Sequence, residues 1–395
     1  MRAALLWMLL SAPVQAEPGR VDLHLHVTMD RAAIPLFHGE PGKGETASSP
    51  SSRLSNQVDY QGLHDNKLWL ALGAMWPPIS LRPGRDALGE SLHQVDQLRE
   101  FCREQPAFGV ATTPKEARRL HELDRIALLP ALEGGEGIEQ VDDVDVLFKA
   151  GVRAITIVHF ADNDVGGAAA GQVASNVFGV HSEARNGNGL SPLGKAVVKR
   201  MAELGIIVDL AHSSDRTSAD ALDILEPLGV PALITHAAAR RYSRSERAID
   251  DELLVRVVKG GGMVGLPLYD KQVRDVPEEG RFEGMVPGTC DDVLAHWLHD
   301  VKLVEPSAVT LGSDFNGFIV RPKAGGSCPN GLRGTSDLGG FYAGLEKHGE
   351  PLEAIDGAYE RFLKLWETVE AHASNEERER ARQMRLPRYD LFDTP

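Results

Sequence analysis

Cysteine is scarce in this chain. Only Cys102, Cys290 and Cys328 occur among the 395 residues. Such a small, odd-numbered set is neither a disulfide framework nor a thiolate zinc site. Cys290 and Cys328 could form one bridge in an oxidising compartment, and the sequence leaves their pairing open.

Positive charge is outnumbered by negative charge, with 42 Lys and Arg residues against 57 Asp and Glu residues. The formal net charge is -15 at pH 7, and no block of Lys or Arg stands out along the chain. Because binding to phosphate groups needs concentrated positive charge, we exclude nucleic acid and an anionic membrane surface as partners. A phosphate-binding barrel is disfavoured as well, since no glycine-rich phosphate loop has a clear local context.

Long apolar runs are missing too. The apolar stretch at 3–10 is too short to span a bilayer. With Arg2 before it and the small-residue pattern Val14-Gln15-Ala16 after it, this stretch predicts a signal peptide over residues 1–16. The alternative is a buried first helix. No cysteine follows the stretch to accept a lipid, and no apolar tail follows Arg385, so we expect a secreted or periplasmic protein without a stable membrane anchor.

The pattern of apolar runs predicts the fold. Eight short runs alternate with helical patterns, at 21–26, 68–76, 126–133, 154–160, 206–213, 232–237, 263–269 and 308–315. Buried parallel strands read as continuous apolar runs, so we predict an α/β fold, a (β/α)8 barrel of the TIM type. No internal repeat or linker is visible, and we expect one domain over residues 17–395. Loop insertions are expected near 38–57 and 166–189, as lids or as surface loops.

Several helices show a clear beginning or an apolar face. Thr113-Pro114 and Ser191-Pro192 each place an N-cap residue before a proline at the first helical position. Asp250-Asp251 place acidic side chains at the positive end of a helix dipole. An apolar stripe at 88–102 and an amphipathic stretch at 353–372 predict two more helices.

Two histidines separated by one residue, His24 and His26, close the first apolar run. Residues i and i+2 of a strand project from the same face, so both imidazoles could reach one metal ion. Later runs end in further potential ligands, namely Glu133, His159, His212, His236 and Asp314. The carboxyl ends of barrel strands converge on the active site. Each residue alone has an ordinary structural explanation, but burying several ionisable groups together favours a metal centre.

These residues lie in segments that resemble the membrane dipeptidase (renal dipeptidase) family of zinc metallopeptidases, within the wider amidohydrolase-like barrels. The segments follow one another in family order: Leu132-Glu133-Gly134-Gly135, Thr156-Ile157-Val158-His159 with Asn163-Asp164, Gly189-Leu190-Ser191-Pro192-Leu193-Gly194, Val208-Asp209-Leu210-Ala211-His212-Ser213, Thr235-His236 and Gly312-Ser313-Asp314-Phe315. Together they are highly specific, although each alone would be modest.

The resemblance implies a centre of two zinc ions. Glu133 matches the bridging carboxylate of the family. His24 belongs to one ion, with His26 as its neighbouring ligand. The other ion is assigned to His212 and His236.

The resemblance also implies residues that act on the substrate. His159 matches a substrate-binding histidine near the metals, and Asp314 matches the catalytic aspartate of strand eight. Arg247 aligns with the arginine expected to grip the substrate carboxylate. Three further arginines compete for that role, with a solvated basic loop as their ordinary interpretation: Arg240, Arg241 and Arg244.

The chain departs from the family pattern in two places. The family normally has His-x-Asp at strand one, whereas this chain has His24-Leu25-His26. A neutral imidazole brings no negative charge to a site that holds two dications, so we expect a weaker or altered first metal site. After strand eight, no clear Gly-Gly-Asn segment of the kind common in the family is present.

The leading hypothesis is an exported zinc-dependent dipeptidase that hydrolyses its small-molecule substrate with a metal-activated hydroxide. Asp314, His159 and Glu133 are the expected catalytic residues, with Asp314 as general base and then general acid. One alternative is a hydrolase of N-acyl amino acids or related amides. Another is a catalytically weak metal- or ligand-binding barrel. A homodimer is left open.

Overall fold

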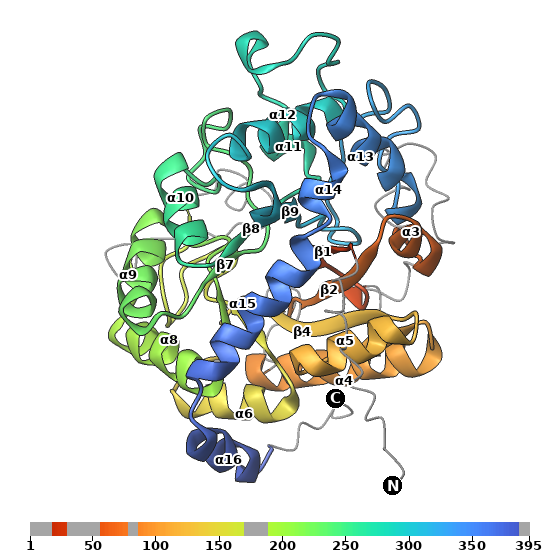
Figure 1. Cartoon of the computed structure of the whole chain (residues 1–395). Coiled ribbons are helices and arrows are strands. Elements are labelled where there is room, and N and C mark those ends of the chain that lie inside the picture. Colours follow the sequence, from red (N-terminus) through yellow and green to blue (C-terminus); the bar gives the residue numbers. More distant parts are fainter. Residues whose placement is uncertain (1–17, 30–55, 78–85, 170–188, 387–395) are drawn as a thin grey trace, which may run out of the picture.

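Eight parallel strands form a closed barrel with helices around it (Figure 1). The computed structural model describes residues 18–29, 56–77, 86–169 and 189–386. The barrel strands are β1 (Arg20–Leu25), β2 (Leu68–Met75), β4 (Ile126–Glu133), β5 (Ala154–Thr156), β6 (Ile207–Asp209), β7 (Leu233–Ile234), β8 (Met263–Leu266) and β9 (Val309–Leu311). The pairings β2–β4 and β1–β9 close the ring. The predicted (β/α)8 barrel is therefore confirmed.

A ninth strand, β3 (Phe108–Val110), lies outside the barrel ring. It pairs with the first residues of β4, from Ile126 to Leu128, while β5 pairs with the last residues of β4 on the same edge. The sequence pattern does not predict β3, because three residues are too few to show a strand period.

Each predicted run contains a barrel strand, but most of the strands end earlier than predicted. The run 206–213, for example, holds only β6, and the chain then leaves the sheet at Leu210. Burial explains the difference, since the apolar pattern continues into loops that are packed as tightly as the strands. These buried loops follow the carboxyl ends of the strands and carry the polar side chains described below.

The helices largely follow the predicted signals. Thr113, Ser191 and Asp250 each cap a helix with the side chain, as expected. The longer helices are α4 (Ala87–Glu104), α5 (Pro114–Glu122), α6 (Asp142–Ala150), α8 (Pro192–Leu204), α9 (Asp215–Leu225), α10 (Asp251–Lys259), α12 (Cys290–Asp300), α13 (Leu338–Lys347), α15 (Ala358–His372) and α16 (Asn375–Gln383). Shorter ones are α3 (Tyr60–Asp65), α11 (Asp270–Val273) and α14 (Leu352–Ile355). No helix of these described segments is both long and apolar enough to cross a membrane.

The single helix predicted at 353–372 is instead two helices, α14 and α15, separated at Asp356 and Gly357. The interruption has a clear cause. The Asp356 carboxylate pairs with Arg20 at 2.6 Å and with Lys67 at 2.7 Å, and its carbonyl accepts from the N–H of Gly19. The chain is thus fastened to the start of β1 at this point, and α15 packs against β1 and β2 beyond it.

Cys290 and Cys328 form a disulfide that joins the start of α12 to the segment after β9. The third cysteine, Cys102, is buried in α4, and burial raises the pKa of its thiol to about 12. Such a thiol is protonated at neutral pH and is not a nucleophile. The predicted signal peptide and most of the two predicted insertions lie outside the described residues, so these boundaries stay predictions.

The end of α12 carries a carboxyl group without a partner. Asp300 is fully buried, and neither of its side-chain oxygens has a hydrogen-bond partner in the described part of the chain. Burial and the nearby charge of Asp251 raise the pKa of Asp300 well above its ordinary value. The folded protein therefore holds a proton that the unfolded chain releases.

An aspartate in the unfolded chain has a pKa of about 4. Because the pKa of Asp300 is higher in the folded protein, its contribution to the free energy of unfolding should fall as the pH increases above this value. Asp300→Asn, which mimics the protonated form, should be more stable than the native chain at about pH 8 and differ from it much less at about pH 4. Urea unfolding at both pH values measures this, with the exposed Asp275→Asn as the matched control. An equal effect of Asp300→Asn at both pH values would contradict the prediction.

Candidate metal centre

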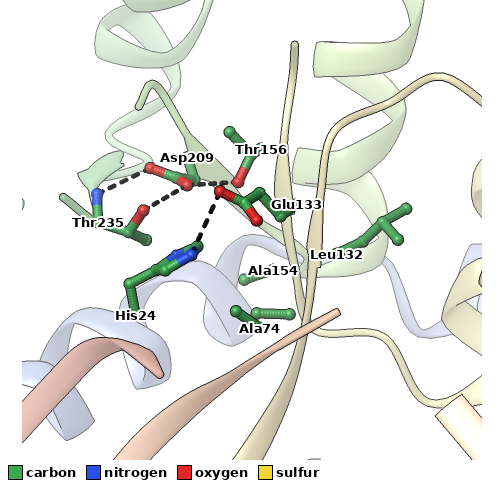
Figure 2. A pocket seen from close by; sticks show the side chains of 9 residues that line it. His24, Ala74, Leu132, Glu133, Ala154, Thr156, Asp209 and Thr235 are labelled. Carbon is green, nitrogen blue, oxygen red and sulfur yellow. Dashed lines mark hydrogen bonds and ion pairs between the residues drawn. The ribbon is translucent and has the colours of Figure 1, made fainter. Parts of the chain in front are cut away.

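Glu133, the last residue of β4, lies at the middle of a ring of imidazoles. Its side chain is only 5% exposed. One carboxylate oxygen, Oε1, lies 3.3 Å from His24 Nε2, and the two groups face each other in Figure 2. The same oxygen lies 3.3, 3.4 and 3.6 Å from the Nε2 atoms of His159, His212 and His236 respectively, and Oε2 lies 3.6 Å from Nε2 of His26. Five histidines, at or just after the ends of β1, β5, β6 and β7, thus meet at one carboxylate.

The imidazole nitrogens also approach one another. Nε2 of His212 lies 2.9 Å from Nε2 of His236, and Nε2 of His24 lies 3.2 Å from that of His26. His26 Nε2 is 3.3 Å from Oδ1 of Asp314. Three groups of donor atoms each lie within 4.8 Å of one another: His24, Glu133 and His236; His24, His26 and Asp314; and Glu133, His159 and His212. This set of nitrogen and carboxylate donors fits a divalent cation such as zinc.

The charge states of these groups also fit a cation. Burial alone would raise the pKa of Glu133, but the charges of His159 and His24 outweigh burial and hold it well below its ordinary value. Burial lowers the pKa of His212 and of His236 well below the usual range. An ionised carboxylate and neutral imidazoles are the forms that bind metals.

His24 behaves differently. Burial lowers its pKa, but the Glu133 carboxylate more than offsets this, and the pKa rises to about 9. His24 thus carries the positive charge that balances Glu133 when no cation is bound.

A second buried carboxylate, Asp209, fixes the orientation of one ligand (Figure 2). It accepts hydrogen bonds from the hydroxyl of Thr156 at 2.5 Å and from the hydroxyl of Thr235 at 2.7 Å. Because the Thr235 hydroxyl donates to Asp209, it accepts from Nδ1–H of His236, 3.0 Å away. The Nε2 lone pair of His236 is thereby directed toward Glu133, as metal-binding histidines require.

The loops after the strands hold two of the predicted residues in a strained backbone. His212 and Asp314 have φ values of +63° and +56°, in the left-handed region. Backbone hydrogen bonds maintain both, from Ala169 N to His212 O at 2.7 Å and from Asp314 N to His24 O at 2.9 Å. The strain is typical of residues that are placed for function rather than for stability.

Only one of the four candidate arginines has donors that are both buried and free. Arg247 donates from Nη1 to the carbonyl of His236 at 2.7 Å, while its Nε and Nη2 atoms are buried without a partner among the described residues. Burial lowers the pKa of Arg247 to about 10, so it stays charged at neutral pH. Arg240 is paired with Asp215 at 2.6 Å, and the remaining two, Arg241 and Arg244, are exposed.

The structure therefore brings together the predicted residues His24, His26, Glu133, His159, His212, His236 and Asp314, with Arg247 beside them. Their individual roles stay predictions. Asp209 was not predicted as a site residue, although an acidic residue inside an apolar run is a signal of a buried, partnered carboxylate. Trp76 and Phe160 were not predicted either; their rings pack against the ring of His159 with centroids 5.5 and 3.7 Å away.

The chain belongs to the membrane dipeptidase family, peptidase family M19, whose sequence pattern matches residues 13–380. The resemblance found in the sequence is therefore confirmed. One relative, an uncharacterized dipeptidase of Schizosaccharomyces pombe, is 31% identical over 246 residues, which cover 60% of this chain and 52% of the relative. A second from the same organism is 28% identical over 291 residues, which cover 72% and 64%. The chain thus spans less than two thirds of either relative.

Solved structures share the fold at low sequence identity. The probable dipeptidase PvdM from Pseudomonas aeruginosa is 19% identical with a TM-score of 0.70, covering 90% of this chain and 96% of that one. A metallopeptidase from Rhodobacter sphaeroides, solved with a phosphinate mimic of the dipeptide L-Ala-D-Ala, is 20% identical with a TM-score of 0.68, covering 89% and 99%. These similarities support the assignment of the fold.

The contact between Thr235 and His236 yields a test of the centre. Thr235→Val removes the hydroxyl that accepts from Nδ1–H of His236 and should lower zinc affinity about tenfold or more. Competition against a chromophoric chelator measures this affinity. Thr310→Val is the matched control, because Thr310 is a buried strand threonine whose hydroxyl donates only to the carbonyl of Val21. Equal affinities of the two variants would show that Thr235 does not orient a ligand.

Proposed function

We propose that this protein is an exported zinc-dependent dipeptidase. The observation that carries the proposal is the position of Arg247. Its Nη1 donates to the carbonyl of His236, one of the five histidines around Glu133, and its Nε and Nη2 are buried without a partner among the described residues. The guanidinium group of Arg247 recognises an anion, and the cluster of Glu133 and its histidines is equipped for hydrolysis of an amide. A substrate with both a carboxylate and a nearby amide, such as a dipeptide, satisfies the two together.

The donor groups divide into two sets that share Glu133. His24 and His26 would hold one zinc ion, and His212 and His236 would hold the other. Zinc bound there supplies a Lewis acid that lowers the pKa of water and polarises a carbonyl group. Nitrogen and oxygen donors without thiolates support zinc as the metal.

Arg247 positions the substrate. Its two free atoms, Nε and Nη2, lie on the same edge of the guanidinium group, and that edge matches the two oxygens of a carboxylate. The hydrogen bond from Nη1 to the carbonyl of His236 fixes the direction of this edge. A terminal carboxylate bound there places the adjacent amide within reach of the centre, which favours short substrates.

His159 and Asp314 have complementary tasks. His159 lies among Glu133, Trp76 and Phe160, where its Nε2 can donate to the carbonyl oxygen as negative charge develops there. The Asp314 side chain is 15% exposed, more than that of Glu133, and thus can exchange protons. It accepts the proton of the attacking water and passes it to the leaving amine.

Two observations support export. The N-terminal sequence has the charge, apolar stretch and small-residue pattern of a signal peptide. The disulfide between Cys290 and Cys328 suits an oxidising compartment.

A panel of amides tests the proposed activity. The zinc-loaded protein should hydrolyse dipeptides, including those with a D-residue at the C-terminal position, faster than N-acyl amino acids. Dominant turnover of N-acyl amino acids would show instead that the protein is a hydrolase of N-acyl amino acids. Arg247 would also bind the carboxylate of such a substrate. Bound zinc without turnover of any amide would indicate a binding protein.

Arg247→Ala tests the recognition of the carboxylate. Loss of a charge-assisted pair of about 2–3 kcal/mol should lower kcat/KM for a dipeptide by roughly 30- to 150-fold. Dipeptide amides, which lack the carboxylate, should be poor substrates of the native protein and should be little affected by the substitution. Arg244→Ala, at an exposed neighbouring arginine, is the control. Equal losses on both kinds of substrate would mean that Arg247 does not bind the carboxylate.

A further inference from the structure

The loop at residues 239–249 carries Arg247, and its two ends are joined to each other. Ala239 and Ile249 form a β-bridge, which closes the base of the loop. Arg247 lies two residues before this bridge, and its Nη1 donates to the carbonyl of His236 at 2.7 Å. The position of Arg247 relative to the centre therefore depends on what holds the base of the loop.

A histidine of α12, His296, holds this base from inside the protein. Its side chain is fully buried, and its Nδ1 accepts from the N–H of Ala239 at 3.0 Å. On the other side of the ring, Nε2 lies 3.1 Å from the carbonyl of Val273, the last residue of α11. Because α12 packs against α11 and β8, the imidazole joins the loop to the frame of the barrel (Figure 1).

The two partners of His296 determine its chemical form. A carbonyl can only accept a hydrogen bond and a backbone N–H can only donate one, so the ring is neutral with its hydrogen on Nε2. Burial lowers the pKa of His296 to about 4, which keeps the ring neutral at neutral pH. His296 thus has a fixed acceptor atom, Nδ1, directed at the base of the loop.

We infer that His296 is a positioning residue, which sets the place of Arg247 by accepting a hydrogen bond from the backbone of Ala239. This inference rests on the proposed function, in which Arg247 binds the carboxylate of the substrate. A guanidinium group holds a carboxylate through two parallel hydrogen bonds, and a small displacement of the loop would misalign both.

A second attachment of the loop lies on the surface, at the start of α9. Arg240 pairs with Asp215 at 2.6 Å, and the N–H of Asp215 donates to Glu246 Oε1 at 3.1 Å. The Asp215 side chain is 48% exposed, and exposed ion pairs contribute little to stability. A buried N–H that loses its acceptor is more costly. The position of the loop therefore depends more on His296 than on Arg240.

Two substitutions of similar size separate the two hydrogen bonds of the ring. Asparagine places an amide oxygen near the position of Nδ1, so His296→Asn can still accept from Ala239. Glutamine places an amide nitrogen near the position of Nε2, so His296→Gln keeps a donor for the carbonyl of Val273 and loses the acceptor. His299→Gln is the control, because His299 also lies on α12 but pairs with Asp251 at 2.8 Å.

Steady-state kinetics of the zinc-loaded full chain tests the effect on the substrate. His296→Gln should raise KM for dipeptides about tenfold with little change in kcat, because the carboxylate is bound alike in the ground state and the transition state. His296→Asn and His299→Gln should resemble the native protein. Dipeptide amides, which lack the carboxylate, should be affected by none of the three. Equal KM values for His296→Gln and His296→Asn would overturn the inference.

Hydrogen exchange tests the loop itself and needs no substrate. The N–H of Ala239 should exchange slowly in the native protein and in His296→Asn, and about tenfold or more faster in His296→Gln. Circular dichroism shows whether each variant is folded. Rapid exchange of this N–H in the native protein, or unchanged exchange in folded His296→Gln, would overturn the inference. A chain that hydrolyses no dipeptide can thus still support the attachment by His296, while failing the proposed function.

Discussion

One buried negative charge determines the architecture of the catalytic face. Glu133 ends a strand whose residues are all buried, where a carboxylate would ordinarily be neutral. Imidazoles from other strand ends keep it ionised, with His159 and His24 making the largest favourable contributions. The loops that follow β1, β5, β6 and β7 must therefore all turn inward toward β4. The position of the site is a consequence of balancing this charge.

Two other buried carboxylates of the barrel accept hydrogen bonds from the protein itself. Asp209 accepts hydroxyl and backbone N–H groups, and Asp22 accepts the N–H groups of His24 and Ser313. These donors belong to the protein, although Oδ2 of Asp22 is buried without a partner among the described residues. Glu133 instead faces ring nitrogens that also approach one another, as in the 2.9 Å separation of His212 Nε2 and His236 Nε2. The contrast separates Asp209 and Asp22, which hold loops together, from Glu133, which is suited to a cation.

The sequence alone predicted the barrel, its eight strands and the meeting of the candidate ligands, because each of these depends on local patterns repeated at strand ends. It did not predict β3, which is too short to show a period, or the break before α15, which depends on the contact of Asp356 with Arg20 and Lys67. The choice of Arg247 among four arginines followed from a family resemblance. Only the structure shows the physical difference: Nε and Nη2 of Arg247 are buried without a partner in the part of the chain that the structure describes.

The sequence pattern of one strand was also insufficient to judge the charge around His26. The expectation of a weaker first metal site considered the residues of one strand, where a neutral imidazole stands in the place of an acid. In a closed barrel, β1 and β9 are neighbours, and Asp314 reaches His26 from the second of them. The charge available to a cation is a sum over all strand ends that face it, so a neutral residue on one strand can be offset by a carboxylate on the next. The strength of a site in this fold is therefore decided between strands rather than within a motif.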